Sequence, residues 1–475
     1  MSSPRILLDL STTMRWVGPP VGILRVEGEY ARFARRRLPN AGFVFFDPDD
    51  LCYRHVRDEA ADAVLNEDAV IDTVGLPDPT GRRSHKTNIV PARLRPAALW
   101  VLRSRHQALM ALERMRRTAP PPLARAAERI QRHLITDKDR HVMVRSDGGR
   151  RPVWSRRAAL GPPVAFGPDD TLVCAGTGWF HTNIEAIARH KRETGFRLAL
   201  LCYDIIPLLL PDCFQPHDTA MFRSYTDVAF PAADLVLVNA RCTQTDVQAW
   251  CRAQGLPLAR TAVVPLGADG PMPPSDDAAP PALPGGLEPG RYAMFVSTLE
   301  PRKNHRVLVD AWRRLIDAGV PQATGFRLVF VGRFGWNVEP LLKEIAADPR
   351  LVRSILHLPE AEDGLVAALY RGAAFCCYPS RYEGYGLPVI EAFRFGKAVL
   401  ASTGGALPEV VAEFSPCIDP DDAEGWTVML RRWIEDPSAR ALYEARIRTA
   451  FGHPGWDQAA AAFFAQVGGA TGIDA

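Results

Sequence analysis

The residues best suited to chemistry lie in the segment PSRYEGYGLPVIE at 379–391. Gly384 and Gly386 let the backbone approach a ligand closely, and the predicted helix that follows begins with free amide groups that attract an anion. Glu383 lies in the loop, and Glu391 lies inside that helix. One carboxylate can contact the far end of a ligand while the other accepts hydrogen bonds from a diol. The alternative is a glycine-rich turn with two solvated glutamates.

Two adjacent cations form a second candidate site in the segment STLEPRKNH at 297–305. This segment follows a predicted strand and precedes a predicted helix. Arg302 and Lys303 can neutralise a diphosphate, a role that magnesium fills in other proteins. Adjacent cations before a helix are often only surface charge, which is the alternative. Ligands of doubly wound folds bind at the carboxyl edge of the sheet, so the position of this pair favours the binding role.

The spacing of strands and helices indicates what holds these segments in place. A chain of 475 residues exceeds the roughly 250–300 residues at which a single core stops growing, so we expect two domains. Apolar strands alternate with helices in both halves, which predicts an α/β fold with a parallel sheet in each half. Strands are predicted at 5–10, 171–176, 197–204, 234–240, 261–267, 292–298, 327–332, 356–359, 374–380 and 398–402.

A segment rich in Pro, Gly and Asp at 268–290 predicts a linker between the two domains. We therefore expect a Rossmann-like domain at 1–285, interrupted by an insertion at about 80–160, and a second Rossmann-like domain at 286–455. Residues 456–475 are expected to complete a C-terminal helix that can pack back on the first domain.

Positive charge is concentrated in the insertion. The net charge is only +3, yet residues 82–157 hold twenty Lys or Arg and five Asp or Glu. Within them, 99–117 and 123–135 combine apolar and basic positions at helical spacing. Basic amphipathic helices can lie on an anionic membrane leaflet, and they can also present an ordinary solvated face. Both interpretations stay open.

Composition argues against several other classes of protein. No stretch reaches the roughly 18 uncharged apolar residues of a membrane span. The N-terminal MSSPRILLDL has too short an apolar run for a secretory signal, so we expect a cytoplasmic protein that could be peripheral at the inner face of the membrane. The nine cysteines include no CxxC pair, which argues against a zinc site or a disulfide framework.

With FVGRFGW (330–336), LVAALYRGAAF (365–375) and STGGALPEVV (402–411), the two candidate segments resemble the donor domain of retaining glycosyltransferases of family 4. Glu383 and Glu391 match the family's E-x7-E pattern, and the resemblance covers nearly all of 290–450. It implies the GT-B fold, in which two Rossmann-like doubly wound domains face each other across a cleft. In the first half it is weaker and rests on GILRVEGEY, CYDIIPLLLPD, ADLVLVNARCTQTD and VVPLGAD.

The resemblance implies a role for each matching position. Arg302 and Lys303 hold the donor diphosphate, and Glu391 holds the ribose hydroxyls. Glu383 holds the sugar together with the backbone from Gly384 through Tyr385 and Gly386 to Leu387. The base lies near Leu358 to Glu360, and the loop from Gly18 to Gly22 closes over the phosphates.

Two positions depart from the family's pattern. Many members carry arginine where this chain has Thr298, so neutralisation of the diphosphate rests more on Arg302 and Lys303. Many also carry histidine where this chain has Tyr203. Asp204, the next residue, is then the better candidate for orienting the acceptor or handling its proton.

We therefore expect a retaining hexosyltransferase, with mannosyl transfer from GDP-mannose as the best guess and a GDP-sugar favoured over a UDP- or dTDP-sugar. The expected partners are the donor and a saccharide or lipid-linked acceptor of bacterial surface polysaccharide synthesis, with an anionic membrane surface as an option for 82–157 and no nucleic acid. A non-catalytic sugar-nucleotide-binding relative is the alternative. An epimerase or a dinucleotide-dependent oxidoreductase is disfavoured, since no G-x-G-x-x-G follows the first strand.

No cofactor or metal is expected, although three D-x-D triplets are present. They lie at Asp47/Asp49, Asp137/Asp139 and Asp419/Asp421. Two of them contain proline, and none follows the expected strand, loop and helix of a nucleotide site. We interpret all three as turns.

Overall fold

The structure is a computed structural model, and it describes residues 4–16, 22–73, 115, 120, 122, 123, 126, 151–268 and 282–469. The helices predicted at 99–117 and 123–135 lie almost entirely outside the described residues. So do most of the predicted linker at 268–290 and positions 18 to 21 of the glycine-rich loop.

The first half of the chain forms an eight-stranded sheet in the order β10-β9-β8-β7-β1-β2-β3-β6. Six strands are parallel, but β3 runs antiparallel to both β2 and β6, a hairpin edge that the sequence analysis did not predict. A separate pair, β4 and β5, is parallel. The strands are β1 (Ile6–Asp9), β2 (Ala41–Asp47), β3 (Cys52–Val56), β4 (Val70–Ile71), β5 (Val153–Trp154), β6 (Leu160–Pro163), β7 (Thr171–Cys174), β8 (Arg197–Cys202), β9 (Leu235–Val238) and β10 (Arg260–Val263).

Both faces of this sheet are buried, because successive strand residues point to opposite faces. In β8, Leu198 and Leu200 join one core cluster, while Ala199 and Leu201 join the other. The helices of this half are α1 (Ser11–Arg15), α2 (Ile23–Arg37), α3 (Asp58–Leu65), α7 (Arg156–Ala159), α8 (Gly178–His181), α9 (Ile184–Thr194), α10 (Ile206–Leu209), α11 (Pro216–Ala232) and α12 (Arg241–Gln254).

The second half forms a six-stranded, fully parallel sheet in the order β13-β12-β11-β14-β15-β16. Its strands are β11 (Tyr292–Val296), β12 (Arg327–Val331), β13 (Ile355–Leu358), β14 (Phe375–Tyr378), β15 (Val399–Ser402) and β16 (Cys417–Ile418). Its helices are α13 (His305–Asp317), α14 (Val320–Thr324), α15 (Glu339–Ala347), α16 (Pro349–Ser354), α17 (Asp363–Gly372), α18 (Leu387–Arg394), α19 (Leu407–Val411), α20 (Ala423–Glu435) and α21 (Ser438–Ala450). No described helix is long and apolar enough to cross a membrane.

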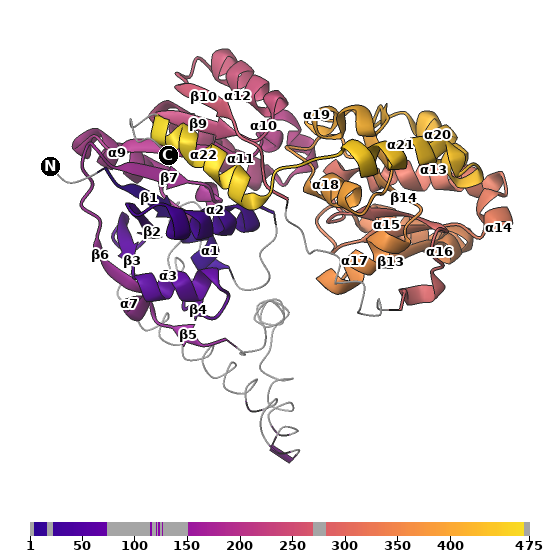
Figure 1. The fold of residues 1–475 in the computed structure, drawn as a ribbon, viewed down its shortest axis with the longest axis horizontal. Coiled ribbons are helices and arrows are strands. Elements are labelled where there is room, and N and C mark those ends of the chain that lie inside the picture. The colour runs from indigo at the N-terminus through magenta and orange to yellow at the C-terminus, as the bar shows by residue number, and fades with distance from the viewer. Residues whose placement is uncertain are drawn as a thin grey trace.

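The last described helix, α22 (Trp456–Gly469), packs on the first half of the chain rather than the second. Figure 1 shows it in yellow, lying across the first unit beside α2. The rings of Tyr30 and Phe463 have centroids 4.6 Å apart. A Cβ on Gly267 would lie 2.5 Å from the Cα of Trp456, so the chain passes there at backbone contact distance. The crossing helix ties the two units together.

Candidate active site

The two candidate segments leave the second sheet side by side. The 297–304 loop follows β11 and the 379–386 loop follows β14, and these strands are paired in parallel. Both loops therefore emerge at the carboxyl edge of the sheet. The backbone N–H of Arg381 donates to the carbonyl of Arg302 at 2.8 Å, which joins the two loops directly.

One carboxylate spans the two cations of this site. Arg302 Nη1 lies 2.9 Å from Glu383 Oε2, and Lys303 Nζ lies 2.6 Å from Glu383 Oε1. The hydroxyl of Ser380 also donates to Glu383 Oε1, at 2.5 Å. Glu383 is 8% exposed, so this ion pairing takes place largely out of water.

The neighbouring charges determine whether Glu383 and Lys303 are protonated. Burial by itself raises the pKa of Glu383, but the charges of Lys303 and Arg302 and the hydrogen bonds from Lys303 and Ser380 lower that pKa to about 2. Burial and the neighbouring Arg302 lower the pKa of Lys303, against the pull of Glu383. Glu383 is therefore ionised at neutral pH, and Lys303 gives up its proton more readily than an ordinary lysine.

Glu300 is a second carboxylate in the cluster that the sequence analysis quoted without assigning it a role. It is 5% exposed, and its Oε1 lies 2.8 Å from Arg302 Nη2. The Nε of Arg302 is buried and has no hydrogen-bond partner in the described structure. Arg302 is thus held by two carboxylates, and its Nε–H is a buried donor without a partner in the described structure.

A short turn presents these cations. Pro301–Lys303 forms a 3-10 turn, and Asn304 after it adopts φ 57°. The amide of Asn304 donates to the carbonyls of Pro379 and Pro420, at 3.1 and 2.7 Å. Asparagine tolerates the left-handed region, and its side chain fixes the turn against the neighbouring loops.

Gly384 brings the first unit against this cluster. A Cβ on Gly384 would lie 2.6 Å from the carbonyl of Tyr203 and 2.8 Å from the carboxyl Oδ2 of Asp204. Burial raises the pKa of Asp204, and the charge of Arg302 partly opposes that rise. The structure therefore brings together Glu383, Arg302 and Asp204, from loops on two sheets.

Two tyrosines named as donor-binding candidates use their hydroxyls elsewhere. The hydroxyl of Tyr203 donates to the carbonyl of Ala175 at 2.6 Å. The hydroxyl of Tyr385 lies 3.0 Å from Nε2 of His453, in the segment that leads to α22. Gly386, which has φ 115°, precedes α18, and Leu387 packs on the first unit's core. This loop offers a ligand its backbone more than its side chains.

Glu391 lies inside α18, away from the ion cluster. The hydroxyl of Tyr370 donates to its Oε2 at 3.3 Å. Burial raises the pKa of Glu391, and the charge of Arg25 in α2 is the main effect opposing that rise. Gly22, with φ 54°, is the last residue of the glycine-rich loop and precedes α2. Because α2 also carries Arg25, whose charge acts on Glu391, the end of this loop lies on the same side of the site as Glu391.

The positions expected to meet the base lie two strands away from the cations. Leu358 ends β13, and its carbonyl accepts from the N–H of Gly332 at 2.9 Å. Glu360 is exposed in the following loop. Thr298 is half-buried, with its methyl 3.1 Å from where a Cβ on Gly335 would lie.

A cavity of about 340 Å³ opens beside Asp204 and Arg302. Its wall is mainly apolar and comes mostly from β7, β8, α8, α10 and α11 of the first unit. Trp336 closes it from the second unit, where its indole N–H donates to the carbonyl of Cys213 at 2.7 Å. Trp336 belongs to the segment FVGRFGW, but its role depends on a contact with a segment more than a hundred residues away.

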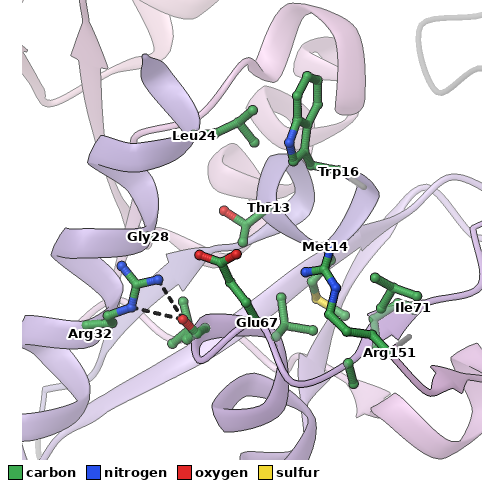
Figure 2. A pocket seen from close by; sticks show the side chains of 13 residues that line it. Thr13, Met14, Trp16, Leu24, Gly28, Arg32, Glu67, Ile71 and Arg151 are labelled. Atoms are coloured by element: carbon green, nitrogen blue, oxygen red, sulfur yellow. Dashed lines mark hydrogen bonds between the residues drawn. The ribbon is translucent and has the colours of Figure 1, made fainter. Parts of the chain in front are cut away.

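Figure 2 shows a smaller hollow of about 40 Å³ between α1, α2 and the segment after α3. Arg32 donates there to the carbonyl of Leu65, and Thr13 lies on its wall. Thr13 also donates from its N–H and hydroxyl to Glu27, at 2.8 and 2.6 Å. Burial, with a contribution from Asp9, raises the pKa of Glu27 to about 8. A hollow of this volume has room for only a few waters.

Two further contacts join the units on the other side of the 379–386 loop. The hydroxyl of Tyr382 donates to Asp246 at 2.5 Å. The carboxylate of Glu409 accepts from the N–H groups of Arg241 and Cys242, at 3.0 and 2.6 Å. These N–H groups begin α12, where a negative charge is stabilising.

The D-x-D triplets at described positions are turns, as expected. The N–H of Asp49 donates to Asp47, and the N–H of Asp421 donates to Asp419. Asp137 and Asp139 lie outside the described residues. Within the described part of the chain, no three His, Cys, Asp or Glu side chains are grouped so that they could hold a metal ion.

The chain is similar in sequence to known glycosyltransferases. Residues 286–450 match the family model described as glycosyl transferases group 1. O-antigen chain mannosyltransferase B of Escherichia coli is 33% identical over 159 residues, which are 33% of this chain and 40% of that protein. Serotype-specific mannosyltransferase WbdA, also of Escherichia coli, is 25% identical over 297 residues, which are 59% of this chain and 34% of that protein. This chain thus spans well under half the length of these two relatives.

A solved structure resembles the whole described arrangement. It is that of HepE from Anabaena in complex with UDP and glucose, with a TM-score of 0.55 and 14% identity, covering 98% of this chain and 99% of that one. At this identity the likeness concerns the fold alone, and it agrees with the predicted GT-B fold. The family model matches the half of the chain that carries Glu383 and its two cations. Residues 286–450 of this chain therefore form a glycosyl transferases group 1 domain.

Proposed function

We propose that this chain is a retaining, metal-independent glycosyltransferase that moves a hexosyl group from a nucleotide diphosphate sugar to an acceptor hydroxyl. The cluster of Glu383 with Arg302 and Lys303, at the carboxyl edge of the second sheet, carries the proposal. It belongs to the group 1 domain and faces Asp204 of the first unit. The two cations, with the carboxyl groups of Glu383 and Asp204 beside them, match the charges that such a transfer develops.

Each charged group then has a part in the reaction. The bond between the anomeric carbon and the diphosphate oxygen breaks, so the sugar ring gains positive charge and the diphosphate gains negative charge. Arg302 and Lys303 stabilise the leaving diphosphate, and this interaction strengthens as the bond breaks. Glu383 holds sugar hydroxyls and stabilises the positive ring. The acceptor oxygen bonds to the same face of the anomeric carbon, and its proton passes to the leaving diphosphate or to Asp204.

The remaining expected residues would hold the rest of the donor. Glu391 would accept hydrogen bonds from the ribose hydroxyls. The backbone from Gly384 to Leu387 would bind the sugar, and the loop that ends at Gly22 would cover the phosphates. Leu358 and Glu360 would lie near the base.

GDP-mannose is the first donor to test, and the mannosyl unit is the group we expect to be transferred. The relatives named above are called mannosyltransferases, and one is named for the O-antigen chain. The acceptor would be a saccharide or lipid-linked saccharide of a bacterial surface polysaccharide, bound by 1–285, while 286–455 binds the donor. Residues 82–157 would carry the protein to the inner face of the membrane. Absence of co-sedimentation with anionic liposomes at low salt would refute that last point.

A thermal-shift screen tests the donor assignment first. The purified protein is melted with GDP, UDP, dTDP or ADP and with the corresponding sugars. A ligand at 100 times its Kd adds about 2.7 kcal/mol of stability. We expect GDP and GDP-mannose to raise the melting temperature and GDP-mannose to support transfer. Binding without transfer or slow hydrolysis would favour a non-catalytic sugar-nucleotide-binding protein.

A further inference from the structure

The cavity beside Asp204 combines a few charged side chains with a mainly apolar wall. Partly exposed Asp218 is among the lining residues, as are Asp204 and Arg302, whose Nε has no partner. The rest of the wall is mainly aromatic and aliphatic. The rings of Trp179 and Phe222 have centroids 5.1 Å apart there. The cavity thus offers both charged groups, from Asp204 and Arg302, and a larger apolar surface.

The hydroxyl of Thr226, on the mainly apolar wall of the cavity, is already used. It donates within its own helix to carbonyls of the preceding turn, at 2.9 and 3.1 Å. Thr226 is 2% exposed, and Phe230 on the same helix is also 2% exposed. A sugar ring placed against this wall would lose water from hydroxyl groups without regaining a hydrogen bond from Thr226.

The size of the cavity sets the size of its occupant. Its volume is about 340 Å³, whereas an apolar cavity of roughly 150 Å³ accepts one benzene molecule. The cavity therefore has room for an alkyl chain or for about two rings. An apolar cavity of this size that stayed empty would forgo packing contacts that well-filled cores make.

We propose that the acceptor carries an apolar group next to the sugar that receives the hexosyl unit, and that this group enters the cavity behind Asp204. The inference rests on the proposed transferase function and specifies its acceptor. The acceptor hydroxyl lies beside Asp204 and Arg302, which both line the cavity. The apolar group anchors the acceptor between α8 and α11, while Trp336 of the second unit closes the cavity over it.

Matched glycosides test this inference by binding alone. Methyl, octyl and phenyl α-mannosides share one sugar and differ only in the group at the anomeric oxygen. Trp179 and Trp336 line the cavity, so intrinsic tryptophan fluorescence reports its occupation. We expect the octyl or the phenyl compound to bind at least about tenfold more tightly than the methyl compound. The octyl and phenyl arms distinguish an alkyl chain from an aromatic ring.

Two substitutions on α11 locate the site. Thr226→Phe fills the cavity and is expected to abolish the preference over the methyl compound. Ala220→Phe adds the same ring at an exposed position of the same helix and is expected to leave the preference unchanged. A thermal melt checks that both variants fold. If Thr226→Phe does not fold, Phe222→Trp fills the cavity from the same helix instead.

Equal binding of all three mannosides by the wild-type protein would overturn the inference, and so would the absence of binding by both the phenyl compound and, below its micelle concentration, the octyl compound. A preference that survives in the cavity-filling variant would also overturn it. Donor binding is read separately, from the melting shift with nucleotide. Loss of that shift contradicts the proposed function, whereas loss of the apolar preference with the shift intact contradicts only the assignment of the acceptor.

Discussion

Lys303 Nζ lies 2.6 Å from Glu383 Oε1, so the lysine proposed to bind the donor diphosphate is already paired with the carboxylate proposed to hold the sugar. Arg302 contacts the other oxygen of the same carboxylate. An incoming diphosphate must therefore share these two cations with Glu383. When the phosphates bind these cations, they weaken the ion pairs that hold the Glu383 carboxylate. Changing the charge of Glu383 or Lys303 should therefore change the affinity for the diphosphate.

Replacing Glu383 by glutamine should separate binding from transfer. The substitution removes the negative charge that competes for Arg302 and Lys303, so we expect GDP to bind at least as tightly as in the wild type. Transfer should fall by about a hundredfold or more, because the positive sugar ring loses its stabilising charge. Calorimetric titration with GDP and a transfer assay measure the two effects. Glu424→Gln, at an exposed position in the same domain, is the control, and unchanged transfer in Glu383→Gln would refute the assignment.

The same carboxylate should contribute to stability above acidic pH. The pKa of Glu383 is about 2 in the folded protein, below its ordinary value of 4.5. Its contribution is therefore fully present above pH 4.5 and is lost as the pH falls through 2. Between pH 6 and pH 3 the wild type should lose about 2 kcal/mol more than Glu383→Gln. Urea unfolding at the two pH values measures this difference, and parallel losses would contradict the ion-pair account.

Adding a methyl group to Gly384 should disturb the meeting of the two units. The new Cβ would lie 2.6 Å from the carbonyl of Tyr203, so the loop or the first unit must shift. A displacement of about 1 Å can cost a hundredfold in rate. We expect Gly384→Ala to lose transfer by about that factor while GDP affinity changes little. Gly364→Ala, which has nothing within 4 Å of the new methyl, is the matched control. Equal activity of the two variants would exclude a close approach at Gly384.

The packing of α22 on the first unit should be visible as stability. Phe463 is fully buried against Tyr30 and Phe464. Phe463→Ala should lower the free energy of unfolding by about 3–5 kcal/mol, through lost transfer energy and the cavity left behind. Val428→Ala, at a residue 57% exposed on α20, should change it by less than about 0.5 kcal/mol. A denaturant titration compares them, and similar losses would place α22 away from this core.

Sequence patterns predicted most of the parallel strands, but not β2 or β16. Strands such as β11 and β12 are buried on both faces, so they are continuous apolar runs that differ clearly from the helices around them. The antiparallel hairpin of β2 and β3 was not predicted. Its turn, DPDDL at 47–51, carries a recognisable Pro and Asp signal, but no strand was predicted on either side of it.

The candidate site could be predicted in part. Arg302, Lys303 and Glu383 lie next to strand ends and belong to recognisable segments, so their types and positions were informative. Trp336 was not assigned a role because it acts through a contact with a distant segment. Glu300 was not assigned one either, although its partner, Arg302, is only two residues away. The apolar cavity depends on six or more segments meeting in space, and no local pattern encodes that meeting.

Lys303 should make diphosphate binding sensitive to alkaline pH. Burial and the charge of Arg302 lower its pKa from the ordinary 10.5. As the pH rises through that lowered pKa, the ammonium loses its charge and with it part of its attraction for the diphosphate. We therefore expect the affinity for GDP to fall, by about tenfold, at a pH below 10.5. Guanosine, which has the same base and no diphosphate, controls for titration of the base. In Lys303→Arg the guanidinium stays charged, so the decline should disappear, and an identical decline in that variant would show that another group is responsible.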